Sequence, residues 1–209
     1  MSRNTLIILA KTPRRGLVKS RLARDIGAGA ATAWYRQNLA RTLRRLGLPK
    51  RWECRIIAAP RHAAAWPWPT PWRFSHQARG DLGQRMLKAL RSACKGPTVL
   101  IGSDIPGITP GHIAAAFRAL GRNDAVFGPS TDGGYWLVGF SARYRGNPFT
   151  AVRWSTGWAL EDTLAGFRPG MKIGFVEKMQ DVDEGPDLAA VADGLRRSGQ
   201  TVRARADAA

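Results

Sequence analysis

Five cationic side chains lie within eleven residues near the start of the chain, directly after a short apolar run. Lys and Arg heads, together with backbone N–H groups at the start of a helix, bind phosphate oxygens, and a glycine lets the backbone come close to the anion. The segment matches neither a Walker A loop nor a G-x-G-x-x-G fingerprint, so a solvated basic turn remains the alternative to phosphate binding. The residues in question are Lys11, Arg14, Arg15, Gly16, Lys19 and Arg21.

Three carboxylates in the second half of the chain could hold a divalent metal. Asp104 lies at the tip of a buried-strand pattern, and Asp181 and Asp183 point to the same side if their segment is extended. Mg²⁺ prefers one or two carboxylates together with substrate phosphates and water. We therefore predict a Mg²⁺ or Mn²⁺ site at these three aspartates. The alternative is a capped turn before Pro106 and a solvated acidic turn.

A pair of glycines follows Asp132 and precedes two aromatic residues, Tyr135 and Trp136. Asp-Gly-Gly is first of all typical of a hairpin turn. The same glycines, Gly133 and Gly134, would also let a substrate lie against the backbone beside Asp132 and Tyr135. The sequence leaves both interpretations open.

The sequence lacks the residue arrangements that nucleophilic hydrolysis or a zinc site would need. No Ser-His-Asp or Cys-His arrangement stands out, the three histidines share no metal spacing, and the two cysteines lie forty residues apart. A cation-rich first segment with separated carboxylates later in the chain suits phosphoryl chemistry with a bound divalent metal, where positioning and charge neutralisation do most of the catalysis.

The net charge of +18 lies wholly in the first half of the chain. Residues 1–103 hold 21 basic and 3 acidic side chains, whereas residues 104–209 hold 12 of each. Such a charge is typical of nucleic-acid binding, but 26 of the 33 cations are arginine, whose codons are GC-rich, and no nucleic-acid-binding motif is recognisable. Small anionic ligands attract the same field, so a non-enzymatic nucleic-acid-binding protein is only the third hypothesis.

Alternating strand and helix patterns must position these residues. The order indicates one α/β domain over residues 1–197, built on a mostly parallel sheet with helices on both faces, and a polar tail at 198–209. Ligands of such sheets bind at the carboxyl ends of the strands. The expected strands are Asn4–Ala10, Cys54–Ala59, Trp72–Ser75, Thr98–Gly102, Ala125–Gly128, Tyr135–Phe140 and Lys172–Val176. The expected helices are 19–26, 30–46, 82–93 capped by Asp81, 110–120 capped by Thr109, 158–167 capped by Ser155 or Thr156, and 187–197 capped by Asp187.

Apolar runs in the sequence are short. None approaches the roughly 18 residues of a membrane span, and the run at residues 6–10 is too short for the core of a signal peptide. We therefore expect a soluble, cytoplasmic protein with no membrane span.

Several short segments occur in a characteristic order over roughly residues 5–190. They are Leu9–Pro13, Val18–Leu22, Gly80–Met86, Ile101–Pro106, Gly128–Tyr135, Trp154–Thr156 and Asp181–Asp183. The ordered set resembles the radical-SAM/selenodomain-associated transferases, a bacterial family with the nucleotide-diphospho-sugar transferase (GT-A) fold. The Lys-Ser-Arg-Leu segment at 19–22 also resembles phospholactate guanylyltransferases.

This resemblance implies a single-domain, GT-A-like, Rossmann-like fold and a transferase that acts on a nucleotide-activated substrate. It implies a metal at Asp104, with Asp183 or Asp181 as the second carboxylate. Together with the chemistry of the first loop, it predicts nucleotide phosphates at Lys11, Arg14, Gly16, Lys19, Arg21 and Arg85. It places the second substrate, a small acceptor, at Asp132, Gly133, Gly134, Tyr135, Trp154, Ser155 and Thr156.

The chain departs from the family pattern in two places. Glu184-Gly185 replaces the usual residues after the last Asp-x-Asp. The segment Trp66–Trp72 carries proline at alternate positions and lies outside the pattern. One interpretation is a rigid connector whose tryptophans pack on the body of the protein. The other is an aromatic contact surface for a partner subunit or a sugar ring.

Two enzymatic hypotheses follow. In the leading one, an acceptor phosphate or hydroxyl attacks the α-phosphorus of a nucleoside triphosphate and releases pyrophosphate, with Lys19, Arg21 and Asp104 as catalytic residues. The alternative is glycosyl transfer from a nucleotide sugar. A strict Asp-x-Asp would favour it, but Gly102 stands two residues before Asp104. The base, the acceptor and the oligomeric state stay open, a homodimer included.

Overall fold

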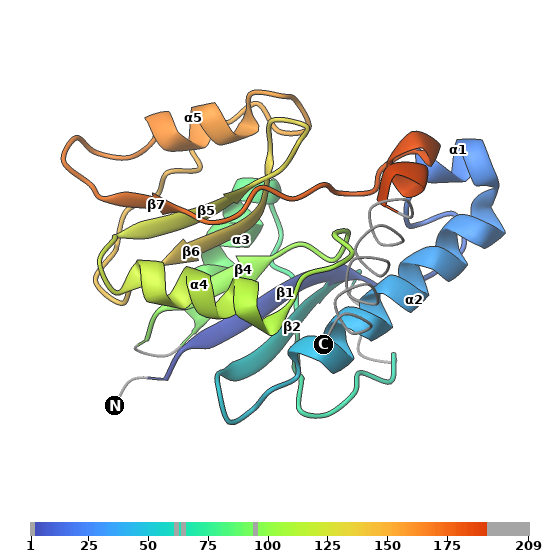
Figure 1. Ribbon diagram of the computed structural model, residues 1–209, viewed down its shortest axis with the longest axis horizontal. Coiled ribbons are helices and arrows are strands. Elements are labelled where there is room, and N and C mark those ends of the chain that lie inside the picture. The colour runs from blue at the N-terminus through green and yellow to red at the C-terminus, as the bar shows by residue number, and fades with distance from the viewer. Residues whose placement is uncertain (1–2, 61–62, 64–65, 94–95, 192–209) are drawn as a thin grey trace, which may run out of the picture.

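Seven strands form one sheet in the computed structural model, which describes residues 3–60, 63, 66–93 and 96–191 (Figure 1). The order across the sheet is β3-β2-β1-β4-β6-β5-β7. The strands are β1 (Thr5–Lys11), β2 (Glu53–Ala59), β3 (Arg73–His76), β4 (Thr98–Ile101), β5 (Ala125–Pro129), β6 (Tyr135–Phe140) and β7 (Ile173–Phe175). The helices labelled in Figure 1 are α1 (Leu22–Ile26), α2 (Ala28–Leu46), α3 (Leu82–Ser92), α4 (Pro110–Leu120) and α5 (Ala159–Ala165). The predicted α/β fold is confirmed.

One strand, β6, runs against the others. It pairs antiparallel with both β4 and β5, whereas every other pair of neighbours in the sheet is parallel. The start of β6, at Tyr135, therefore lies at the same edge as the ends of β1 and β4. This edge is where ligands of such sheets bind.

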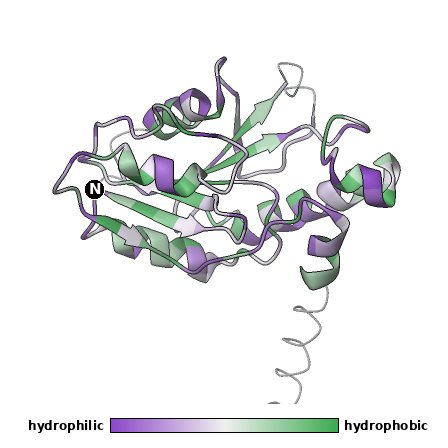
Figure 2. Cartoon of the chain, turned by 90° about the horizontal axis from the view of Figure 1, so that it is seen from above, coloured by the Kyte–Doolittle hydropathy of each residue, from purple (hydrophilic) through white to green (hydrophobic). Residues whose placement is uncertain are grey.

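Helices cover both faces of the sheet, which explains the continuous apolar runs in the strands. Leu6 and Ile8 of β1 pack in one cluster with α2 and α4, whereas Ile7 packs in the other with α3. Successive strand residues point to opposite faces, so a strand buried on both sides shows no alternation. Figure 2 shows the hydrophobic colour along the strands in the middle of the molecule.

Local signals place most helix ends correctly. Thr109 begins α4 with a capping box that His112 completes, and Asp81 begins α3 by accepting the Gln84 N–H. Two predicted caps are wrong. Trp158 precedes α5 without a side-chain cap, and the Thr156 hydroxyl accepts the Trp158 N–H in the turn before the helix.

The predicted cap at Asp187 is also displaced. The last described helix begins at 185, and the Asp187 carboxylate lies inside its first turn, accepting the N–H groups of Asp183 and Glu184. Residues 192–197 of the predicted helix and the predicted tail at 198–209 lie outside the described residues.

The Pro- and Trp-rich segment packs on the body of the protein at its described residues. Trp72 is buried and donates its indole N–H to the Leu43 carbonyl, and Trp68 stacks on Phe74 of β3 with 5.9 Å between ring centroids. These contacts fit the connector interpretation. Among the residues that the structure describes, no helix is long and apolar enough to cross a membrane.

Candidate functional site

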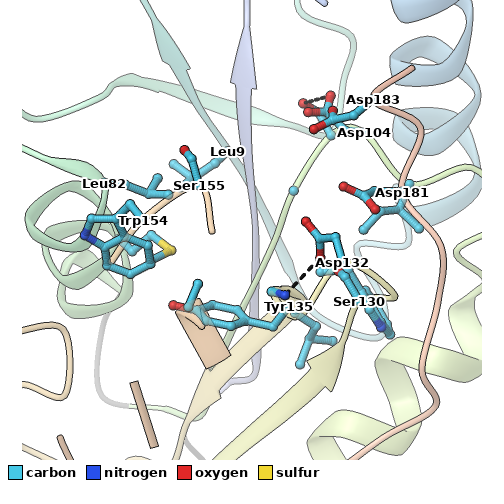
Figure 3. A pocket seen from close by; sticks show the side chains of 18 of the residues that line it. Leu9, Leu82, Asp104, Ser130, Asp132, Tyr135, Trp154, Ser155, Asp181 and Asp183 are labelled. Carbon is cyan, nitrogen blue, oxygen red and sulfur yellow. Dashed lines mark hydrogen bonds between the residues drawn. The ribbon is translucent and has the colours of Figure 1, made fainter. Parts of the chain in front are cut away.

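A cavity of about 720 Å³ opens at the carboxyl edge of the sheet. It lies beyond the ends of β1 and β4 and the start of β6, and side chains from the loops after β4, β5 and β7 border it (Figure 3). Most of the predicted site residues line it, from both halves of the chain. They are Lys11, Lys19, Arg21, Arg85, Asp104, Asp132, Gly134, Tyr135, Trp154, Ser155, Thr156, Asp181 and Asp183.

Three predicted residues do not line this cavity. Arg14 and Gly16 lie in an exposed turn, where the Arg14 carbonyl accepts the Leu17 N–H. Gly133 has a φ of 84°, and a Cβ there would collide with the backbone carbonyl of Gly157. We conclude that these two glycines shape turns. The cation-rich loop at residues 11–21, called the first loop, directs only some of its cations into the cavity.

Lys19 lies between two carboxylates. Its Nζ is 2.7 Å from Asp183 Oδ1 and 3.1 Å from Asp104 Oδ2, and its side chain is only 5% exposed. Burial alone would lower the pKa of Lys19, but the charges of Asp104 and Asp183 outweigh it and raise the pKa above its usual value. The ammonium therefore keeps its proton. Arg21 adds a second, more exposed cation 3.6 Å from Asp183.

Packing beneath the last loop brings Asp183 to this point. Val182 is fully buried in a small cluster with Leu22 and Ala31, and its N–H donates to the Asp104 carbonyl. Residues on either side of a buried residue in an extended segment point the other way. Asp181 and Asp183 both border the cavity.

The donor set suits a divalent metal only in part. No group of three or more His, Cys, Asp or Glu side chains gathers as a metal site within the described residues, so the predicted trio of Asp104, Asp181 and Asp183 is not brought together. Asp104 and Asp183 do share one cation, the Lys19 ammonium. Two carboxylates fit Mg²⁺ or Mn²⁺, which take the remaining ligands from phosphates and water.

Asp181 lies beside other carboxylates. Burial, followed by the charges of Asp132 and Asp183, raises the pKa of Asp181 to about 6.

A buried tyrosine that the sequence analysis missed holds the ends of β1 and β4 together. The Tyr35 hydroxyl of α2 accepts the Lys11 N–H at 2.9 Å and lies 2.9 Å from Ser103 Oγ. Asn38, one turn later, donates to the Ser103 carbonyl. Both residues therefore position the strand end that carries Asp104. Their only sequence signal is two polar groups on the buried face of a helix.

The far end of the cavity is apolar. Leu9, Leu82 and Trp154 border it, with Tyr135 below them (Figure 3). The Tyr135 hydroxyl lies 3.4 Å from the hydroxyl of Thr163 on α5, and burial raises its pKa above the usual value. This end can accept a ring or an apolar group.

An ion pair fixes the loop that carries Trp154, Ser155 and Thr156. The Arg153 guanidinium donates to both Asp162 oxygens at 2.8 and 2.7 Å, and its backbone N–H donates to one of them. These bonds to Arg153 lower the pKa of Asp162 to about 2. The loop is therefore tied to α5.

Arg85 of α3 lines the cavity, and a residue that was not predicted from the sequence, Gln77, holds its guanidinium there. Its Nη1 donates to Gln77 Oε1 at 3.1 Å, while the Gln77 amide donates to the Ala10 carbonyl at 2.9 Å. Gln77 follows β3, so Arg85 is linked to the end of β1.

The Asp-Gly-Gly segment forms the hairpin turn that the sequence predicted, and it also borders the cavity. It connects the antiparallel strands β5 and β6, with the Ser130 N–H donating to the Gly134 carbonyl, and Asp132 Oδ1 accepts the Gly134 N–H at 2.9 Å. Asp132 and Gly134 also line the cavity. The hairpin thus presents its own turn to a ligand.

Sheet order, one reversed strand and a cavity at the carboxyl edge define the nucleotide-diphospho-sugar transferase fold. The chain belongs to the family described as "Uncharacterized protein conserved in bacteria (DUF2064)", whose model matches residues 42–156. No curated protein matches the chain.

Solved structures share this fold. A proposed nucleotide-diphospho-sugar transferase from Desulfovibrio desulfuricans G20 is 30% identical, with a TM-score of 0.83 over 91% of this chain and 87% of that one. The 2-C-methyl-D-erythritol 4-phosphate cytidylyltransferase of Thermus thermophilus is 15% identical, with a TM-score of 0.56 over 94% and 100%. Rv0371c of Mycobacterium tuberculosis H37Rv, in complex with manganese, is 15% identical, with a TM-score of 0.50 over 90% and 97%. The last two likenesses concern the fold alone.

Proposed function

We propose that this protein is a divalent-metal-dependent transferase that moves a nucleotidyl group from a nucleoside triphosphate to a small acceptor. An acceptor phosphate or hydroxyl oxygen forms a bond to the α-phosphorus, and the bond from that phosphorus to the bridging oxygen of the β-phosphate breaks. Pyrophosphate leaves with the bridging oxygen. The observation that carries this proposal is the cluster of Lys19, Arg21, Asp104 and Asp183 at the edge of the sheet.

The carboxylates and the cations have complementary roles in this scheme. Asp104 and Asp183 would hold Mg²⁺ or Mn²⁺, which, when bound, neutralises charge on the phosphates and on the leaving oxygen. Lys11, Lys19 and Arg21 bind the triphosphate and stabilise the leaving pyrophosphate. No covalent enzyme intermediate is needed, because such transfers depend mainly on positioning and electrostatics.

The acceptor occupies the second half of the cavity in this scheme. The hairpin at Asp132 and Gly134 presents backbone groups to it, and the loop 154–156 closes the apolar end beside Tyr135. Bonds between Arg153 and Asp162 hold that loop in place before any ligand binds. Preorganised contacts of this kind cost little when the substrate is ordered.

Glycosyl transfer from a nucleotide sugar is the second candidate. It is favoured by the 30% identity to a proposed nucleotide-diphospho-sugar transferase and by Trp154, whose ring could contact a sugar face. The strand end beside Asp104 argues against it. Ser103, the residue before it, bonds to Tyr35, and Gly102 stands where a strict Asp-x-Asp would place a carboxylate.

Product analysis separates the two candidates. The protein is incubated with Mg²⁺, a mixture of small phosphate- and hydroxyl-bearing acceptors, and either a panel of nucleoside triphosphates or a panel of sugar nucleotides. We expect pyrophosphate from the first panel. Nucleoside diphosphate from the second panel, with no pyrophosphate from the first, would establish glycosyl transfer instead.

Removal of one carboxylate tests the role of the site. Asp104→Asn keeps the shape of the side chain and should lower kcat about a hundredfold or more, because a metal contributes several kcal/mol of charge stabilisation. The matched control is Glu177→Gln, since Glu177 is 69% exposed and does not line the cavity. Equal activity of the two variants would contradict the proposed role of Asp104.

A further inference from the structure

Lys19 occupies the position between the carboxylates where the proposed function requires a metal. We propose that Lys19 makes metal binding depend on the nucleotide. In the absence of nucleotide, Lys19 pairs with Asp104 and Asp183. Phosphates of the incoming nucleotide draw the ammonium away, and the two carboxylates are then free for the divalent ion. This inference rests on the proposed function.

The contacts of Lys19 show that it holds both carboxylates at once. Asp104 follows β4, and Asp183 follows β7, so the two charges approach each other only in the folded sheet. Without a cation between them they would repel each other. The indole of Trp34, whose centroid is 5.9 Å from the Lys19 Nζ, borders the same ammonium. Lys19 therefore has a defined position before any ligand binds.

The same oxygens of Asp104 and Asp183 cannot bind the Lys19 ammonium and a divalent ion at the same time. Ligand oxygens lie about 2.0–2.1 Å from Mg²⁺, whereas the Lys19 Nζ is 2.7 and 3.1 Å from the two aspartates. Two cations on one pair of oxygens repel each other. Binding of the metal alone would break two ion pairs and leave beside the ion the ammonium of a side chain that is only 5% exposed.

A triphosphate removes this conflict. It supplies new acceptors for the ammonium, and the long lysine side chain can turn toward them without a change in the backbone. The Lys19 backbone has a φ of 51°, in a region that non-glycine residues rarely adopt. Such outliers cluster at ligand-binding sites. Lys11 and Arg21, which line the same cavity, would bind the remaining phosphate oxygens.

A titration with Mn²⁺ tests this inference without any turnover. Electron paramagnetic resonance measures the concentration of free Mn²⁺ at each step. Wild-type protein and Lys19→Met are titrated with Mn²⁺ alone and with Mn²⁺ plus inorganic tripolyphosphate, a probe that needs no base. A protein-free titration corrects for Mn²⁺ bound by the tripolyphosphate in solution. We expect Lys19→Met to bind Mn²⁺ alone about tenfold more tightly than wild type, because two partly exposed ion pairs together correspond to roughly that factor.

Tripolyphosphate should then increase the Mn²⁺ affinity of wild type more than that of Lys19→Met, because only wild type has an ammonium between the carboxylates for the phosphates to displace. Lys11→Met is the matched control. It removes the same charge from the same cavity, but its ammonium forms no ion pair with a described residue. Its affinity for Mn²⁺ alone should change by less than about twofold. Lys19→Gln replaces Lys19→Met if the latter does not fold.

Three results decide the matter. Unchanged or weaker Mn²⁺ binding by Lys19→Met in the absence of tripolyphosphate would overturn the inference. So would an equal gain in the Lys11→Met control, because the effect would then be general electrostatics. If tripolyphosphate does not raise the Mn²⁺ affinity of wild type, phosphates do not displace Lys19 and the inference is overturned as well, whereas the proposed function is tested separately by the pyrophosphate assay.

Discussion

The Tyr35 hydroxyl bridges the end of β1 and the strand end that carries Asp104. Its removal therefore tests how the site is held together. Tyr35→Phe deletes one oxygen and keeps the ring, which is 2% exposed in the main core cluster. The Lys11 N–H loses its partner at 2.9 Å, and Ser103 Oγ loses a second bond of the same length. Burial, followed by the charge of Asp104, raises the pKa of Tyr35, so the hydroxyl stays protonated in the wild type.

The Lys11 N–H is left without its side-chain partner, and this loss sets the size of the effect. An unpaired buried polar group costs about 1–3 kcal/mol, and Ser103 can still reach Asp104 Oδ1 at 3.3 Å, so we count the loss mainly at the Lys11 N–H. The free energy of unfolding should fall by about 1–3 kcal/mol, which lowers Tm by roughly 2–4 °C per kcal/mol in a chain of this length. Because Asp104 is then less firmly positioned, kcat should fall about tenfold.

Urea unfolding followed by tryptophan fluorescence measures the loss, and we expect a lower midpoint with an unchanged slope. The control is Tyr144→Phe, because the Tyr144 hydroxyl has no hydrogen bond to the described residues, and its change should stay within about 0.5 kcal/mol. If Tyr35→Phe is as stable and as active as wild type, the hydroxyl does not hold β1 to β4, and strand pairing alone positions Asp104.

Two further substitutions test the loops around the cavity. Gly133→Ala places a Cβ against the Gly157 carbonyl at a φ of 84°, so the free energy of unfolding should fall by about 2 kcal/mol or more in the same urea assay, and unchanged stability would contradict this turn geometry. Asp162→Asn removes the negative charge and one of the two oxygens that accept bonds from Arg153, whose bonds hold the pKa of Asp162 at about 2. Its Tm should be lower than wild type at neutral pH, and the difference should vanish as the pH falls from about 4 to below about 2, because the charge-dependent stabilisation exists only while the carboxyl is ionised. A difference that is independent of pH would exclude the ion pair as its cause.

Local patterns were sufficient for most elements of this fold. A short apolar run between turn residues predicts a buried strand, and caps such as Asp81 and Thr109 begin their helices where the sequence places them. These signals depend on near neighbours in the chain. The direction of β6 relative to β5 is local as well, because the Asp-Gly-Gly hairpin joins the two strands. The place of β6 beside β4 is not local, because that pairing joins residues that lie far apart in the sequence.

The candidate site was predictable as a set of residues but not as a set of contacts. Strand ends led to Asp104, Asp132 and Asp183, which all line the cavity. The sequence assigned Lys19 to phosphates and the carboxylates to a metal, yet Lys19 and Asp183 meet across 164 residues of chain. No local sequence pattern predicts a contact between two residues that lie so far apart in the chain. The contact depends on the packing of Val182, which brings Asp183 to the end of β4.

Residues that act through other residues escaped the sequence analysis for a different reason. A tyrosine on the inner face of α2 resembles any other core residue, and only its bonds to Lys11 and Ser103 show what it positions. Conversely, Arg14 and Gly16 had suitable chemistry in a suitable loop, but the turn at 14–17 leaves them outside the cavity. Residue type and loop location do not fix the direction of a side chain.

The uneven distribution of charge has a structural consequence at this site. Cations that lay next to carboxylates in the sequence would pair with them in short, solvated contacts whether or not the sheet had formed. Here Lys19 lies in a half with only 3 acidic residues, and both of its partners lie in the other half. Its two ion pairs therefore exist only when the loops after β4 and β7 lie against the first loop. Because the same lysine is buried between those loops, the cationic and carboxylate parts of the candidate site come together only in the folded sheet.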